Sequence, residues 1–212
     1  MDISNKTLAL VLVVALVVSM TGTLLSLNRL QSIGIRGITG RAGSDQGNVT
    51  LTVSSAASLI FRINAINFGS GTINTSAGVN NCTMDSMGNR NAGCASFTTV
   101  TQGLVLENDG NENLSVTMNS TVNSTDFIGG TIEGGPLFQW NITNNESTSC
   151  KTGLYAGNGT FVDVNKSQMD ICSDFVWQDT VDSILVHVLV RIPSDSLTGQ
   201  RNATFLAVGT QN

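Results

Sequence analysis

The sequence predicts a mainly β protein with one long hydrophobic α-helix at its N-terminus, in which the β part is an antiparallel β-sandwich of the Ig-like, Greek-key type. Three observations support this fold class. An apolar segment of membrane-spanning length opens the chain, short segments with a two-residue hydrophobic period follow it, and Gly-rich turns separate them. Because no second amphipathic helix follows, two β-sheets packed face to face are expected to bury the alternating residues.

The apolar segment at residues 8–27, LALVLVVALVVSMTGTLLSL, contains no charged side chain. At about 1.5 Å per residue it spans about 30 Å, which is the hydrocarbon thickness of a bilayer. A core helix of a soluble domain is rarely apolar on every face over this length. We therefore expect the helix to contact lipid or other apolar helices through Leu8, Leu10, Val11, Leu12, Val13, Val14, Leu16, Val17, Val18, Leu24, Leu25 and Leu27.

Three fates are open for this helix: a cleaved signal peptide, a permanent single-span anchor, or a helix that leaves the membrane and packs in the core of a filament. A signal peptide has a shorter apolar run and an A-x-A-like site, and this segment has neither. By the positive-inside rule, Lys6 before the span and Arg29, Arg36 and Arg41 after it would place the C-terminal side in the cytoplasm. The rest of the chain favours the opposite orientation.

Sequons for N-glycosylation recur along the chain after the helix. An Asn- and Thr-rich composition produces some of these matches by coincidence, but bulky solubilising sugars suit the surface of an exported protein. The density of sequons therefore favours a glycosylated body outside the cell. The eleven predicted sites are Asn48, Asn74, Asn81, Asn113, Asn119, Asn123, Asn141, Asn145, Asn158, Asn165 and Asn202.

Four cysteines follow the helix: Cys82, Cys94, Cys150 and Cys172. They allow three pairings, of which we prefer the local one, Cys82–Cys94 and Cys150–Cys172, because it closes loops of 13 and 23 residues. Each bridge would contribute about 3 kcal/mol through loop-closure entropy. Zinc binding is disfavoured, because the cysteines are widely spaced and the chain has a single histidine. Disulfides also place the body outside the cytoplasm.

These patterns divide the chain into a polar leader at 1–6, the hydrophobic helix at 7–33, a Gly-rich linker at 34–47 and the extracellular β-sandwich at 48–212. The linker has glycine at every third position but no proline, which favours flexibility over a collagen-like repeat. About 180 residues follow the helix, which is enough for one sizeable β-domain or two small ones.

Apolar and polar residues alternate in eight segments of the β region, and each predicts a strand. The segments are 49–53, 59–63, 103–108, 114–118, 137–142, 160–164, 183–192 and 203–208. Asp109 and Gly110 predict a tight hairpin between the third and fourth of these strands. The residues between paired cysteines are expected to be surface excursions that the disulfides hold.

Motifs that carry catalysis are missing from the sequence. It contains no G-x-S-x-G elbow, Walker loop, dinucleotide fingerprint or H-E-x-x-H motif. His187 is expected to be a structural residue on the less apolar face of the strand 183–192. Asp163, Asn165, Ser167 and Asp170 alternate oxygen ligands as calcium loops do, but the glycine and the terminal glutamate of an EF-hand are missing, so an Asx-rich turn is preferred. We expect no enzyme activity, no catalytic residue, no metal and no cofactor apart from N-linked glycans.

Composition excludes one class of partner. The net charge is −5 and the sequence pI is about 4.6, whereas binding to nucleic acid needs a basic surface. Trp140, Tyr155 and Trp177 could face a carbohydrate, but they are expected to pack inside the sheets. Neither a nucleic acid nor a small-molecule substrate is expected, and the predicted partners are the membrane and further copies of the chain.

The plan of apolar helix, short connector and Thr-, Asn- and Gly-rich β-domain resembles archaeal surface-filament subunits of the type IV pilin and archaellin kind, and also membrane-anchored β-sandwich surface glycoproteins of archaea. The start MDISNKTLALVLVVALVV is similar to a class III signal, in which a polar leader ends in a positive residue, here Lys6. Two features depart from that pattern: Thr7 replaces a small Gly or Ala, and no glutamate follows early in the helix.

The resemblance implies a homopolymer in which the helix from about Thr7 forms the filament core and the β-domain forms the shell. The predicted function is therefore that of a structural subunit of an extracellular, pilus-like filament, membrane-inserted before assembly. The alternative is a single-span membrane-anchored surface glycoprotein or adhesin that does not polymerise.

Overall fold

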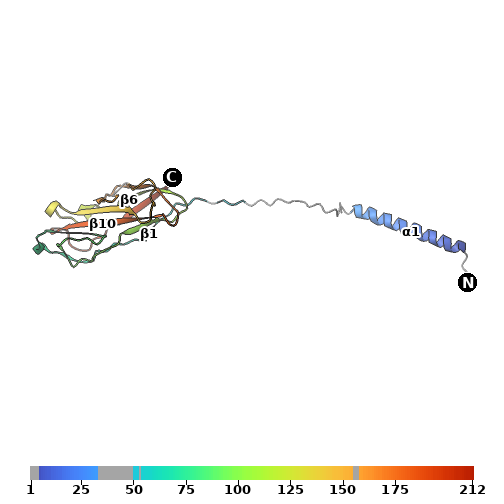
Figure 1. Cartoon of the computed structure of the whole chain (residues 1–212), viewed down its shortest axis with the longest axis horizontal. Helices are drawn as coiled ribbons and strands as arrows, with labels where there is room; N and C mark the ends of the chain where they lie inside the picture. The colour runs from blue at the N-terminus through green and yellow to red at the C-terminus, as the bar shows by residue number, and fades with distance from the viewer. Residues whose placement is uncertain (1–4, 33–49, 53, 155–157) are drawn as a thin grey trace. The chain divides into compact units, whose positions relative to one another are not determined.

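The computed structural model describes residues 5–32, 50–52, 54–154 and 158–212, and the chain divides into two units at 1–52 and 53–212. The first unit contains helix α1 (Asn5–Ser32), and the second contains every strand that is described (Figure 1). The predicted fold class is therefore confirmed: an apolar N-terminal helix precedes a domain of mostly antiparallel β-sheets. Helix α1 begins inside the predicted polar leader. The predicted linker at 34–47 lies outside the described residues.

The larger sheet has the strand order β1-β5-β10-β7-β8, with β3 also paired to β10. Strand β10 is central because it pairs with β7 on one side and with β5 and then β3 on the other. The strands of this sheet are β1 (Leu59–Ile63), β3 (Asn81–Asp85), β5 (Leu104–Asn108), β7 (Leu137–Asn144), β8 (Val162–Asp163) and β10 (Ser183–Pro193).

A second sheet has the order β11-β6-β9, and a third consists of two short strands. The elements are β6 (Leu114–Ser120), β9 (Met169–Phe175) and β11 (Phe205–Gln211) in the second sheet, β2 (Thr72–Ile73) and β4 (Cys94–Ala95) in the third, and the short helices η1 (Thr75–Ala77), α2 (Ser124–Phe127) and η2 (Ile132–Gly134). Strand β8 is shorter than the predicted strand at 160–164, and β11 begins two residues later than predicted.

The core lies between the two larger sheets. Alternate residues of β10 and β6 are buried, which the two-residue period of their sequences requires. Phe205 of β11 contacts both Phe138 and Trp140 of β7, with ring centroids 5.6 and 5.5 Å apart. Because these aromatic contacts join the two sheets, the domain is a sandwich, as the sequence predicts.

The predicted hairpin around Asp109 and Gly110 is wrong. Strand β5 belongs to the larger sheet and β6 to the smaller one, so the chain crosses between sheets here. Gly110 is required for space, because a Cβ there would lie 2.3 Å from the carbonyl oxygen of Ala56. Asn108 holds the crossing by donating from Nδ2 to the carbonyls of Glu112 and Phe175.

The predicted strand at 49–53 is also not found. Residues 50–52 belong to no strand, and the Leu51 side chain is 83% exposed, whereas Val49 and Val53 lie outside the described residues. An alternating pattern predicts two faces, but a strand forms only where a neighbouring backbone accepts its hydrogen bonds.

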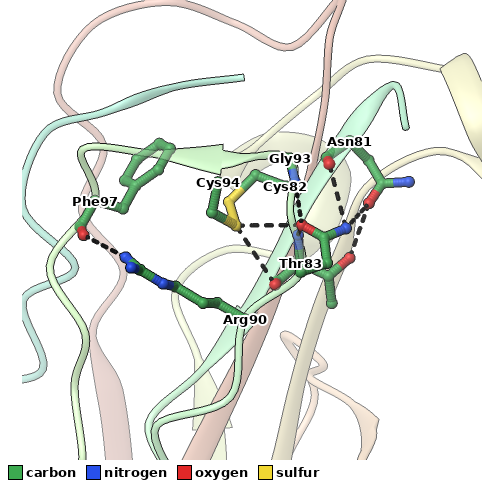
Figure 2. Close-up of a disulfide and its surroundings, with 8 residues drawn as sticks. Asn81, Cys82, Thr83, Arg90, Gly93, Cys94 and Phe97 are labelled. Carbon is green, nitrogen blue, oxygen red and sulfur yellow. Dashed lines mark hydrogen bonds between the residues drawn. A yellow bond between two sulfur atoms is a disulfide. The ribbon is translucent and has the colours of Figure 1, made fainter. Parts of the chain in front are cut away.

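Both disulfides have the predicted pairing, Cys82–Cys94 and Cys150–Cys172. The segments they close are more than the expected surface excursions. Cys82 is fully buried in β3, which adds to the larger sheet, and Cys172 is buried in β9. Figure 2 shows how the first bridge joins β3 to the returning chain, where Arg90 donates to the carbonyl oxygen of Phe97.

Replacing Cys150 and Cys172 together with alanine should lower the free energy of unfolding by about 3 kcal/mol, because the open 23-residue loop gains entropy in the unfolded chain. Urea unfolding of the full chain in detergent, followed by the fluorescence of the buried Trp140, measures the change. Wild-type protein unfolded under reducing conditions is the control and should match the variant reduced in the same way. An unchanged urea midpoint under oxidising conditions would contradict the prediction.

Candidate functional site

The surface of helix α1 is the largest apolar surface among the described residues. Leucine, valine and methionine side chains cover the helix on every face, and from Asn5 to Ser26 each residue is exposed. The predicted contact residues from Leu8 to Leu25 are between 55% and 67% exposed, and the side chain of Leu27 is outside the described set. An apolar surface on every face of a helix suits contact with lipid or with other apolar helices.

The hydroxyls of Thr21 and Thr23 in α1 are satisfied by the helix itself. Thr21 Oγ1 donates to the carbonyl oxygen of Val17 at 2.8 Å, and Thr23 Oγ1 donates to that of Ser19 at the same distance. A hydroxyl that bonds one turn back places no unpaired donor on the surface. The sequence TGT near the C-terminal end of the span is therefore compatible with an apolar environment, where an unsatisfied group would cost several kcal/mol.

Leaving this helix in water is strongly unfavourable. Complete burial of one leucine or valine side chain contributes about 1.5–3 kcal/mol, and twelve large apolar side chains of α1 are exposed. Their combined burial corresponds to roughly 20 kcal/mol or more. A bilayer and a bundle of apolar helices would each provide this stabilisation, because both remove the whole surface from water.

The ten described sequon asparagines fall into three environments. Asn74, Asn145, Asn158, Asn165 and Asn202 are exposed, and Asn141 is only 5% exposed; the others are half-buried, at Asn81, Asn113, Asn119 and Asn123. Asn48 lies outside the described residues.

Several sequon amides are already engaged in hydrogen bonds. The Nδ2 atoms of Asn113 and Asn119 donate to Asp174 Oδ1 and to the carbonyl oxygen of Lys166, both at 2.7 Å. Asn81 donates in the same way to Glu133 Oε2 at 3.1 Å. Since Nδ2 is the atom that bonds to a sugar, the sequon sites differ in availability, which the motif does not reveal.

His187 faces away from the core on β10, as the sequence predicts, and its ring is half-buried. Its Nδ1 atom lies 3.3 Å from Ser86 Oγ, which also accepts the backbone N–H of Val188 at 2.9 Å. Burial lowers the pKa of His187. Ser86 is completely buried, so its hydroxyl is not accessible to a substrate. Its hydrogen bond with Val188 joins it to β10.

The oxygen-rich segment from 163 to 170 has the character of a turn. Asn165 Oδ1 accepts the N–H of Ser167 at 3.2 Å, and Asp163 Oδ1 accepts a hydrogen bond from Gln139 at 2.8 Å. Within the described ranges no three acidic, histidine or cysteine side chains gather as metal ligands. Of the aromatic candidates, Trp140 is buried and Trp177 is 42% exposed, whereas Tyr155 is outside the described residues.

An acidic cluster that sequence reasoning missed lies where β10 begins. Asp182 is 6% exposed, and its N–H donates to Glu146 Oε2 at 2.9 Å. Burial, together with the negative charges of Glu107, Glu146 and Asp179, raises the pKa of Asp182 to about 6. Asp179 is close to Asp182 in the sequence, but Glu107 and Glu146 are far from it, so no local pattern could identify the whole cluster.

The chain was compared with family models, with curated proteins and with solved structures, and none of them matches it.

Replacing Asp182 with asparagine should stabilise the protein at pH 7.5 by about 2 kcal/mol. The folded-state pKa is raised, so the contribution of this carboxyl to stability is present below pH 4 and is lost as the pH rises through about 6. Asparagine stays neutral, and its advantage should disappear towards pH 4. Urea unfolding at several pH values measures the difference, with the exposed Asp170→Asn as the control. Equal gains at pH 4 and pH 7.5 would contradict the assignment.

Proposed function

We propose that this chain is a structural subunit of an extracellular filament, in which α1 packs against copies of itself and the β-domain faces solvent. The observation that carries the proposal is the continuous apolar surface of α1, which is exposed on every side from Asn5 to Ser26. A helix in the centre of a homopolymer has neighbours all around it, so it needs apolar residues on every face.

Features of the β-domain support a location outside the cytoplasm. Two disulfides, Cys82–Cys94 and Cys150–Cys172, close short loops, and such bridges persist in oxidising compartments. Sequons on exposed asparagines such as Asn74 and Asn202 are compatible with a glycosylated outer surface. The acidic charge keeps the domain soluble once it is outside.

The second candidate is a single-span surface glycoprotein or adhesin in which α1 remains in lipid. One observation favours it: the twenty-two residues from Asn5 to Ser26 match the hydrocarbon thickness of a bilayer without surplus. In that case the β-domain acts as an isolated tethered module.

Shearing of the producing cells without detergent, followed by high-speed centrifugation and electron microscopy, separates the two candidates. Filaments should pellet and appear as fibres that contain the full β-domain. Recovery of the protein only as a detergent-extracted monomer from the membrane fraction would overturn the filament proposal and support the anchored glycoprotein.

Leu12→Ala with Leu16→Ala should reduce the filament fraction at least tenfold while insertion into the membrane is retained. In a close-packed core the shortened side chains leave cavities that cost about 2–5 kcal/mol each, whereas fluid lipid tails fill such gaps. Alanine is also the best helix former, so α1 itself should persist. Quantification of pelleted and membrane-bound protein tests this, with the more conservative Leu12→Met as the matched control. Unchanged pelleting by the double variant would argue against helix packing in a filament.

A further inference from the structure

The β-domain has two ends that its hydrogen bonds distinguish. The chain enters the domain beside the end of the last strand: Gln211 Nε2 donates to Ser55 Oγ at 3.3 Å, and the N–H of Ala56 donates to Asn111 Oδ1 at 2.6 Å. We call this the entry end, and Figure 1 shows that the C-terminus lies at it. Strands β6 and β11 are antiparallel, so Ser120 and Phe205 lie at the opposite end, which we call the far end.

Hydrogen bonds bring other segments to the far end. The N–H of Ser120 donates to the carbonyl oxygen of Asn165 at 2.9 Å, and the N–H of Thr121 donates to that of Thr204 at 3.0 Å. Strand β3 meets the last residue of β10 there, with Asn81 opposite Pro193. Asn74 lies nearby, because its N–H donates to the carbonyl oxygen of Gly93 at 2.9 Å and Gly93 packs against the backbone of Asn81. Six of the ten described sequons therefore lie at the far end: Asn74, Asn81, Asn119, Asn123, Asn165 and Asn202.

The remaining described sequons lie elsewhere. Asn113 immediately precedes β6 and Asn145 immediately follows β7, which places both at the entry end. Asn141 and Asn158 lie between the two ends, where Asn158 forms a bridge with Ile142.

The two ends also differ in whether the Nδ2 atoms of their sequon asparagines are free of hydrogen bonds within the described chain. At the far end Asn74, Asn165 and Asn202 are exposed, and Asn123 uses only Oδ1, which accepts the N–H of Asp126 at 2.8 Å. The Nδ2 atoms of these four asparagines donate to no group in the described chain. At the entry end, in contrast, Asn113 donates to Asp174, and Asn145 donates from Nδ2 to Ser183 Oγ at 2.9 Å.

Burial of its side chain excludes a sugar at Asn141. Its side chain is 5% exposed, and Oδ1 has no hydrogen-bond partner within the described residues. A glycan at this position would have to displace the atoms that bury the side chain, so it is incompatible with the folded domain.

We infer that the N-glycans of this protein form a cap at the far end of the sandwich, on Asn74, Asn123, Asn165 and Asn202, and that the entry end stays bare. In the transfer, Nδ2 forms a bond to the anomeric carbon of a phosphate-activated sugar, the bond from that carbon to the phosphate oxygen breaks, and Nδ2 loses one proton. The exposed Asn158 carries sugar as well. This inference rests on the export and glycosylation in the proposed function.

A cap of this kind assigns different roles to the two ends. Hydrated sugars hold neighbouring surfaces apart, so the far end is the part of the domain that meets solvent. The entry end has no available sequon amide among the described residues, and it is therefore the part that can approach neighbouring subunits closely.

Glycopeptide mass spectrometry of the full-length protein, purified from its producing cells, tests the inference. Occupancy at Asn74, Asn123, Asn165 and Asn202 should exceed that at Asn113 and Asn145 at least tenfold, and Asn141 should be unmodified. Equal occupancy at both ends, modification of Asn141, or far-end peptides without sugar would overturn it.

Matched sequon variants give a second measurement that leaves the asparagines in place. Ser167→Ala removes the sequon of Asn165 and should reduce the mass of the intact protein by one glycan. Ser115→Ala removes the sequon of Asn113 and should change the mass only by the lost oxygen. A filament with evenly distributed sugars would overturn this inference alone, whereas a monomer with capped far ends would overturn the filament proposal alone.

Discussion

Pairing along β10 is the interaction on which the β-domain depends, because three other strands take their positions from its backbone. Strand β7 occupies one side, while β5 and β3 follow each other along the second side. Side chains alternate along a strand, so the register of β10 determines which face of each partner enters the core. A shift of one residue would bring His187 and Arg191 into the space that Val186 and Val190 occupy. That exchange would place a charge among apolar side chains, which fixes the register strongly.

The two units satisfy their apolar residues in different ways. Strands of the β-domain turn one face of each sheet inward, and contacts such as that of Phe205 with Trp140 complete the core within the chain. Helix α1 cannot turn a single apolar face inward in this way, because apolar residues lie on all of its faces. Lipid and neighbouring apolar helices are the two environments that would remove such a surface from water. This is the physical basis of the proposed function in assembly.

Polar groups of the β-domain are distributed unevenly between its two ends. The acidic cluster around Asp182 lies at the entry end, where Asp182 adjoins the first residue of β10, and the available sequon amides lie mainly at the far end. Burial makes ionisation of Asp182 unfavourable, so the entry end is more stable in mildly acidic conditions. The entry end of the sandwich thus carries the acidic cluster, and the far end carries most of the available sequon amides.

Alternation in the sequence identified several strands well, including those predicted at 59–63 and 183–192, because a two-residue period reports directly which residues are buried. Alternation did not predict which strands lie side by side in a sheet. Asp109 and Gly110 have the composition of a hairpin turn, yet the chain passes to the other sheet here. The pattern of buried residues in β5 and β6 does not indicate which strand pairs with each of them. The segment 49–53 has the same period but its residues 50–52 form no strand.

The sequence by itself determined the apolar helix and the β class, and it favoured the cysteine pairing that the structure shows. Each of these depends on residues close together in the chain: a continuous apolar run, a local period and short loops. Only the tertiary structure decided which sequon amides are available and why Asp182 resists ionisation. Asn113 is engaged by Asp174, and Asp182 is surrounded by Glu107 and Glu146. Those neighbours are dozens of residues away along the chain. Their proximity arises from strand pairing and sheet packing, which a local pattern of residues does not encode.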